Sequence, residues 1–262
     1  MDYSALSLIL LPAVGFLIGF LVSLVGGSGG LFYVPLLIVG FGVSPRIAVT
    51  TSLATMIPTA FIGSWSHRRQ GNLDLKAGLT FGLTGIVGAL LGVLVSNQIS
   101  AEDLEKVIGL ALIALSVPMA ATAIRRMRSK DKPNQAVTTN MQGSRIIVAL
   151  AFGAMSGFMA GLLGLSGLSF VVTGLYLLGY PATTVVGTSV FVLMFNSAVG
   201  LAGYAWFGQF DLALVLLLSV GASAGALLAP KLMSKFQSKT IERVYGPIFV
   251  AILLLFGLAL LI

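Results

Sequence analysis

The sequence predicts an all-helical membrane protein made of two inverted-topology repeats, each with about five helical segments and a broken or re-entrant glycine-rich turn near the midplane. Composition indicates the environment, because 57% of the 262 residues are hydrophobic and 9% are charged, with a mean hydropathy of +1.04. Such values are typical of polytopic membrane proteins. An internal duplication and the placement of the basic loops predict the two-repeat organisation.

The chain contains one unit twice. A first set of residues recurs in the second half in the same order: Gly15, Gly19, Phe20, Gly26, Ser28 and Gly29 return as Gly153, Gly157, Phe158, Gly164, Ser166 and Gly167. Further along the unit, Thr51-Ser52 matches Thr188-Ser189, and Asp74 matches Asp211. We therefore divide the chain into a first repeat (1–124), a linker (125–145) and a second repeat (146–262).

Each repeat contains five apolar segments. They cover approximately 5–25, 31–42, 47–65, 75–96 and 104–124 in the first repeat, and 146–163, 168–179, 183–206, 212–229 and 241–262 in the second. The first segment has no cleavage-like site and is expected to be a retained helix. A crossing helix needs about 20 residues, so 31–42 and 168–179 are too short for an untilted crossing. Each forms a broken or re-entrant pair with the segment before it, and both arrangements remain open.

The basic residues predict the orientation in the membrane, because cytoplasmic loops collect Lys and Arg. The linker region is strongly basic, with Asp131 as its one acid among Arg125, Arg126, Arg128, Lys130, Lys132 and Arg145. We expect this linker in the cytoplasm, as a tether, and both termini outside. Arg68, Arg69 and Lys76 then lie inside, whereas the matching loop 207–211 has no basic residue and lies outside. Matching loops thus differ in charge, as inverted repeats require.

The two glycine-rich turns are the first candidate site. Glycine lets backbone amides approach a ligand closely, and each turn precedes a helix whose first N–H groups have no intrahelical partner. In inverted repeats, two such helix starts would face each other and bind an anion without a buried cation. The expected donors are Ser28 and Gly29 in the first turn and Ser166 and Gly167 in the second. The alternative is that the glycines allow close packing and the serines cap helices.

A second polar set lies on the third segment of each repeat. Ser52, Thr55 and Thr59 share one helical face, and Thr51 precedes them. The matching segment has Thr188, Ser189 and Asn196 at corresponding places. Hydroxyl and amide groups donate to oxyanions and are tolerated in a membrane better than charges. We expect these residues to line the substrate pathway; bonding to the helix backbone is the alternative.

Two further residues are candidates for substrate binding. Tyr33 follows the first glycine turn, and Arg46 departs from the positive-inside pattern, so it could attract an anion at the external mouth. The aromatic residues Trp65, Tyr204 and Trp206 are expected at the membrane interfaces. Glycine motifs predict close helix contacts, within the chain or in a homodimer; they are Gly78-x-x-x-Gly82, Gly88-x-x-x-Gly92 and Gly221-x-x-x-Gly225.

Several classes of function are excluded or disfavoured. The chain has no cysteine and a single histidine, His67, which excludes thiolate and multi-histidine metal centres; we expect no metal and no cofactor. The basic residues lie in short loops, so we expect no nucleic-acid partner. A Gly164-Leu-Ser-Gly167 turn is similar to that of intramembrane serine proteases, but His67 is predicted at the membrane surface, too far to act as its base. We therefore expect no enzyme.

No acidic residue lies deep in an apolar segment, which disfavours proton-coupled cation transport.

The order of motifs resembles the TauE/SafE sulfite exporter family over essentially the whole chain. The relevant stretches are VGGSGG, LFYVPLL and SPRIAVTTSLA within 19–54, and GLLGLSG and VVGTSVFV within 157–191. The resemblance implies export of sulfite or of C2 to C3 organosulfonates such as sulfoacetate across the bacterial inner membrane. The second turn, GLSGL, is less glycine-rich than the first, so we expect the two half-sites to contribute unequally. An anion channel, a carrier for a carboxylate and, more remotely, a non-transporting membrane scaffold or enzyme are the alternatives.

Overall fold

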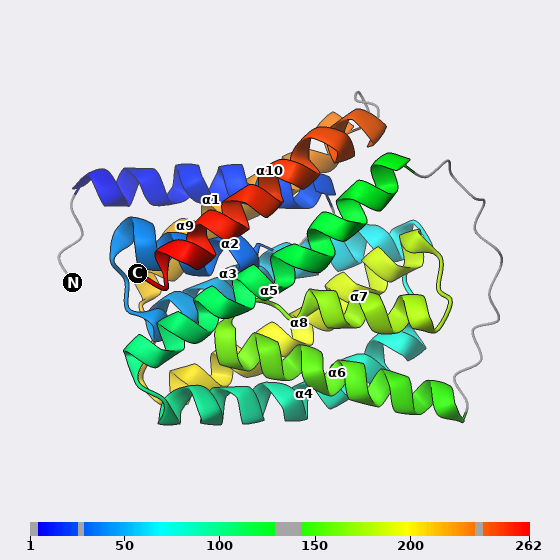
Figure 1. Ribbon diagram of the computed structural model, residues 1–262, viewed down its shortest axis with the longest axis horizontal. Coiled ribbons are helices and arrows are strands. Elements are labelled where there is room, and N and C mark those ends of the chain that lie inside the picture. Colours follow the sequence, from blue (N-terminus) through cyan, green and yellow to red (C-terminus); the bar gives the residue numbers. More distant parts are fainter. Residues whose placement is uncertain (1–4, 26–28, 129–142, 234–237) are drawn as a thin grey trace.

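The computed structural model describes residues 5–25, 29–128, 143–233 and 238–262, and every regular element within them is a helix (Figure 1). The prediction of an all-helical protein is confirmed. The elements are α1 (Ala5–Val25), α2 (Gly30–Pro35), a π-helical stretch η1 (Leu36–Gly40), α3 (Pro45–Arg69), α4 (Leu75–Gln98), α5 (Ala101–Arg128), α6 (Ser144–Leu163), α7 (Leu168–Leu177), α8 (Ala182–Trp206), α9 (Leu212–Met233) and α10 (Ser238–Ala259).

Local sequence signals fix several helix ends. The carboxylate of Asp74 accepts a hydrogen bond from the backbone N–H of Ala77 at 3.0 Å and begins α4. Asp211 accepts in the same way from Leu214 at 3.1 Å and begins α9. Such acidic caps satisfy N–H groups that have no intrahelical partner. Pro35 ends the regular part of α2, and the chain then widens into η1; proline offers no N–H to a regular helical ladder.

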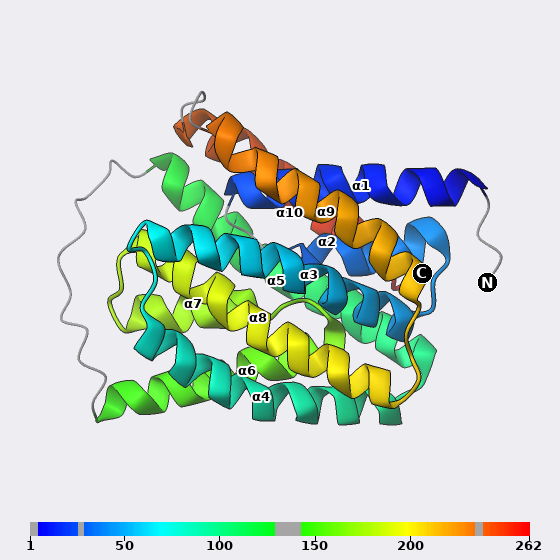
Figure 2. The ribbon, with the colours of Figure 1, turned by 180° about the vertical axis from the view of Figure 1, so that it is seen from behind.

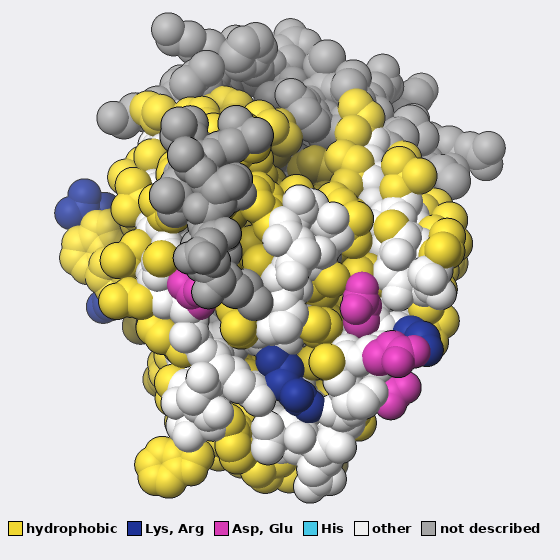
Figure 3. Space-filling model, turned by 90° about the vertical axis from the view of Figure 1, so that its left-hand side faces the viewer, with side chains coloured by type: hydrophobic (Ala, Val, Ile, Leu, Met, Phe, Trp, Pro, Cys, Tyr) yellow, Lys and Arg dark blue, Asp and Glu magenta, His cyan; other side chains and the backbone are white. Residues whose placement is uncertain are grey.

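The lengths of the helices fit a membrane protein. Among the described residues, four helices are long and apolar enough to cross a bilayer, namely α3, α4, α8 and the part of α6 from Arg145 to Leu163. The stretches Gly30–Gly40 and Leu168–Leu177 are shorter apolar helices, in agreement with the short second segment predicted for each repeat. Figure 3 shows acidic and basic side chains on one end of the molecule, with hydrophobic side chains on its flanks.

The two halves of the chain interleave. Helix α1 packs against α9 and α4 packs against α6, so the first helix of each half contacts the fourth helix of the other. The third helices α3 and α8 pack together, as do the fifth helices α5 and α10. Matching helices such as α1 and α6 run in opposite directions along the long axis (Figures 1 and 2). The main buried cluster therefore includes residues from both halves, and the orientation of each half toward the two membrane faces remains a prediction.

Glycines allow these helices to approach closely. A Cβ atom at Gly157 would lie 1.9 Å from the carbonyl oxygen of Gly85, and one at Gly88 would lie 2.0 Å from that of Ala154. On the other side of the molecule, a Cβ at Gly221 would lie 2.0 Å from the carbonyl oxygen of Pro12. Small residues at such crossings are typical of helix packing in membranes. The predicted glycine motifs thus form contacts within the chain, and a homodimer remains a prediction.

Candidate functional site

The second glycine-rich turn has an unusual backbone. Gly164, Ser166 and Gly167 have φ angles of +66°, +66° and +55°. Ser166 is the only residue other than glycine with a positive φ in the described part of the chain, and this conformation costs about 1 kcal/mol or more for such a residue. Its side chain is buried, and its hydroxyl has no hydrogen-bond partner. Strained residues of this kind cluster at functional sites.

The same turn packs against helix α3 of the other half. The hydroxyl of Ser52 donates a 3.1 Å hydrogen bond to the carbonyl oxygen of Gly164. A Cβ at Gly164 would lie 3.0 Å from Cα of Val49, and the φ of +66° would strain any larger residue there. A Cβ at Gly30 would lie 2.6 Å from the carbonyl oxygen of Gly164. The beginning of α2 and the second turn are therefore in contact, and they come together beside α3.

The described part of the first turn begins at Gly29. Its carbonyl oxygen accepts hydrogen bonds from the N–H groups of Phe32 and Tyr33, both at 2.9 Å. The ring of Tyr33 is buried and covers Gly29, because a Cβ there would lie 2.3 Å from the ring edge. Ser28 lies outside the described residues. Tyr33 thus lies beside the turn, as the sequence predicts, and fills space next to it.

The hydroxyls of α3 divide into two groups. Thr55 donates to the carbonyl oxygen of Thr51 at 2.8 Å, and Thr59 donates to that of Thr55 at 3.2 Å. These two donate to their own helix, which was the alternative interpretation of this face. The Thr55 hydroxyl also accepts a 3.3 Å hydrogen bond from Ser219 of α9. The hydroxyl of Thr51, in contrast, is fully buried and has no hydrogen-bond partner. Ser52 is the member of this face that is hydrogen-bonded to the second turn, and Thr51 is its neighbour in the chain.

The matching residues of α8 have different partners. Thr188 accepts a hydrogen bond from the backbone N–H of Asp74 at 3.1 Å. Asn196 donates to the hydroxyl of Ser156 at 2.9 Å, and its Oδ1 atom has no partner. The hydroxyl of Ser189 is buried and also without a partner. Gly167 of the second turn packs against Ser156, because a Cβ at Gly167 would lie 1.9 Å from the carbonyl oxygen of Ser156. Asn196, which is hydrogen-bonded to Ser156, is therefore close to the second turn.

The polar pairs of α3 and α8 lie at different levels of the molecule. The two helices are antiparallel, since Gly63 lies beside Val190 and Gly200 lies beside Leu53. Ser189 therefore lies at the level of the residues next to Gly63 in α3. Those residues are about 12 positions after Ser52, which corresponds to roughly 18 Å along the helix. The structure brings Gly30, Ser52 and the second turn together. It places Thr188 and Ser189 toward the other end of α3, near Gly63.

Arg46 contacts the end of α4. Its guanidinium donates to the carbonyl oxygen of Ser96 at 3.3 Å and to that of Ile99. A cation near the last carbonyls of a helix satisfies them and interacts favourably with the helix dipole. Arg46, which departs from the positive-inside pattern, thus binds the last carbonyl groups of α4. Its role toward an anion stays a prediction.

Tyr204 forms a buried polar contact that sequence reasoning missed. Its hydroxyl oxygen lies 2.7 Å from Ser96 Oγ and 2.9 Å from the carbonyl oxygen of Gly161, and its single proton is donated to one of them at a time. The expectation that Tyr204 lies at a membrane interface is wrong, because the residue is fully buried. Trp65 and Trp206 are exposed, at 50% and 88%. No sequence signal pointed to this burial, because the partners Ser96 and Gly161 lie in two other helices, α4 and α6.

Comparison with known proteins agrees with this architecture. The family model described as "Sulfite exporter TauE/SafE" matches residues 11–260. The chain is 27% identical to the "Probable membrane transporter protein YunE" of Bacillus subtilis, over 94% of this chain and 96% of the relative. It is 29% identical to the "Probable membrane transporter protein YjnA" of the same organism, over 95% and 97%. It is 31% identical to the "Probable membrane transporter protein MJ0441" of Methanocaldococcus jannaschii, over 75% and 73%.

No solved structure matches the chain. The family model nevertheless covers nearly its whole length, and the relatives are named as membrane transporters. The apolar helices and the interleaved halves fit that description. The chain is therefore a membrane transporter, not an enzyme, and it belongs to the TauE/SafE sulfite exporter family.

Proposed function

We propose that this transporter exports a small sulfur-containing oxyanion, either sulfite or a C2 to C3 organosulfonate such as sulfoacetate, across the bacterial inner membrane. The family and the relatives support transport in general, and the family description supports the sulfur oxyanion. The residues that would bind the anion are Ser28, Gly29, Thr51, Ser52, Ser166, Gly167, Thr188, Ser189 and Asn196, with Tyr33 beside the first turn and Arg46 at the external mouth.

One observation carries the proposal: three of the proposed binding residues have a buried hydroxyl without a hydrogen-bond partner. They belong to Ser166, Thr51 and Ser189. A buried polar group without a hydrogen bond costs about 1–3 kcal/mol, so such groups are retained where a ligand satisfies them. Neutral donors suit an anion, because they stabilise its charge without themselves requiring a counterion in the membrane.

The separation of the polar pairs suggests how the anion moves. Thr51 and Ser52 lie beside the second turn, whereas Thr188 and Ser189 lie about 18 Å further along the paired helices. If the halves are inverted, these pairs are matching half-sites that alternate between the two membrane faces as one half rocks against the other. The hydrogen bond from Ser52 to Gly164 would then form in one state and break in the other.

Uptake and counterflow in proteoliposomes test the proposed substrate. The panel contains sulfite, sulfoacetate, sulfolactate, taurine, sulfate and acetate, each supplied outside vesicles that hold the same unlabelled compound. We expect saturable counterflow of sulfite or an organosulfonate in preference to acetate. Preference for taurine would contradict the anion site, because taurine is a zwitterion, and preference for acetate would indicate a carboxylate carrier. Flux that follows voltage and does not saturate would indicate a channel.

A further inference from the structure

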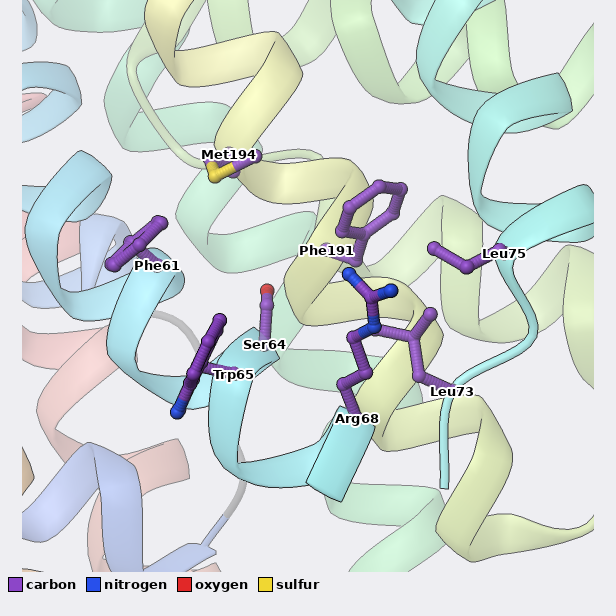
Figure 4. A pocket seen from close by; sticks show the side chains of 8 residues that line it. All are labelled: Phe61, Ser64, Trp65, Arg68, Leu73, Leu75, Phe191 and Met194. Carbon is purple, nitrogen blue, oxygen red and sulfur yellow. The ribbon is translucent and has the colours of Figure 1, made fainter. Parts of the chain in front are cut away.

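A groove lies away from the glycine turns, at the end of α3 that carries the arginines. It is a hollow of about 90 Å³ between α3, the beginning of α4 and α8 (Figure 4). A space of this size holds several water molecules, since one water needs about 10–15 Å³ on this measure. The lining residues are Phe61, Ser64, Trp65, Arg68, Leu73, Leu75, Phe191 and Met194.

The groove is shaped by close packing at its base. A Cβ at Gly63 would lie 3.0 Å from Val190, so α3 and α8 are in close contact here. A Cβ at Gly78 would lie 2.6 Å from the ring of Phe191, so α4 and α8 are also in close contact. Phe191 and Met194 of α8 therefore form the floor, and side chains of α3 and α4 form the walls.

The walls are apolar and open to the outside of the protein. Phe61 is 58% exposed, Trp65 is 50% exposed and Leu75 is 40% exposed. In a membrane protein such side chains contact acyl chains. A free small anion would gain little from these walls, whereas the tail of an amphiphile would bury apolar surface against them.

The polar groups of the groove suit an oxyanion. The Ser64 residue is 7% exposed, and its hydroxyl has no hydrogen-bond partner. Figure 4 shows Ser64 between Trp65 and Arg68, with the guanidinium of Arg68 next to Phe191. The guanidinium of Arg69 lies 5.0 Å from the centre of the Trp65 ring. Neither arginine has a carboxylate partner within the described ranges, where the one ion pair joins Lys106 and Glu102.

We propose that this groove binds an anionic phospholipid, with the phosphate at Arg68 and Ser64 and an acyl chain along Phe61, Trp65 and Leu75. Charge complementarity supports this occupant, since two arginines without acidic partners lie at the rim of an apolar groove. The charge pattern of the loops predicts that this end of α3 lies at the cytoplasmic face, where anionic lipids attract basic residues. This proposal does not depend on the transported substrate.

The two tryptophans of the chain provide a direct test. In a Trp206→Phe background, Trp65 is the single fluorophore and lies in the groove wall. The protein is placed in phosphatidylcholine vesicles that contain increasing fractions of dibrominated phosphatidylglycerol or dibrominated phosphatidylcholine. We expect the brominated anionic lipid to quench Trp65 at about fivefold lower mole fraction than the zwitterionic lipid, as one basic contact near the surface predicts.

Variants distinguish a specific lipid site in the groove from a general attraction of anionic lipids to the basic end of the protein. Arg68→Gln should abolish the preference for the anionic lipid, and Ser64→Ala should reduce it. Lys76→Gln, which removes a charge at the same end but outside the groove, should retain it. An equal loss in Arg68→Gln and Lys76→Gln, or no preference in the parent protein, would overturn the proposal. Displacement of the brominated lipid by soluble glycerol phosphate or sulfite would also overturn it, because the groove would then be a site for a free anion.

Discussion

The hydroxyl of Ser52 in the first half of the chain donates a 3.1 Å hydrogen bond to the carbonyl oxygen of Gly164 in the glycine turn of the second half. A residue of the predicted pathway therefore contacts a predicted half-site of the other repeat. The bond joins neutral groups and contributes about 1 kcal/mol. It is thus weak enough to break and reform during a transport cycle.

Ser52→Ala should lower the rate of sulfite counterflow, roughly fivefold, because the turn loses the contact that positions it. Thr59→Val is the matched control on the same helical face, since its hydroxyl donates to carbonyl oxygens of its own helix. That control should change the rate less than twofold, because such bonds to the helix backbone contribute little. Equal effects of the two substitutions on counterflow would show that the turn contact has no special role.

Thr51→Val and Ser189→Ala should each weaken transport without loss of stability. Both remove a buried hydroxyl that has no partner, so the unfolding temperature in detergent should stay the same or rise. The KM for the anion should increase, because a donor to the substrate is lost. Lower stability together with an unchanged KM would indicate that these hydroxyls are structural and would remove them from the proposed site.

Arg46 combines a structural contact with a proposed role toward the anion. Arg46→Lys keeps the charge but loses the forked donors that reach Ser96 and Ile99. We expect this variant to be less stable and to retain uptake at low substrate concentration. Arg46→Gln should be less stable and should also have a higher KM. If the two variants have the same KM as the parent protein, Arg46 acts on α4 alone.

Gly157→Ala should destabilise the contact between α4 and α6. The added Cβ would lie 1.9 Å from the carbonyl oxygen of Gly85, and overpacking of this kind costs about 1–3 kcal/mol. Gly40→Ala is the control, because its added Cβ would meet no atom closer than 3.5 Å. Thermal unfolding in detergent compares the two. Comparable stability of both variants would contradict the close helix approach.

The sequence allowed the helices to be placed, whereas their partners had to come from the structure. Bilayer thickness sets helix length, and caps such as Asp74 mark the ends, so predicted and observed helices differ by only a few residues. The pairing of α1 with α9 and of α4 with α6 depends on matching surfaces that are far apart in the chain. The burial of Tyr204 follows from the pairing of α4 with α6. The different levels of Ser52 and Ser189 follow from the antiparallel packing of α3 and α8. Hydrophobic patterns encode neither.

The two glycine turns were found as candidates because they recur. Their conformations could not be predicted, since Ser166 adopts a positive φ that the sequence alone disfavours for serine. Ser166 also provides a matched pair of variants. Ser166→Ala removes the hydroxyl and keeps a side chain in the strained conformation, whereas Ser166→Gly removes the hydroxyl and relieves the strain.

The counterflow of sulfite in proteoliposomes that contain the Ser28→Ala, Ser166→Ala double variant tests the central claim most directly. The Ser166→Gly variant is measured beside it, to separate loss of the hydroxyl from a change in backbone strain, and membrane insertion is verified for both. We predict a strong loss of counterflow in the double variant and a clear loss in Ser166→Gly, with normal insertion. Counterflow equal to that of the unmodified protein in the double variant would contradict a substrate site at the glycine turns.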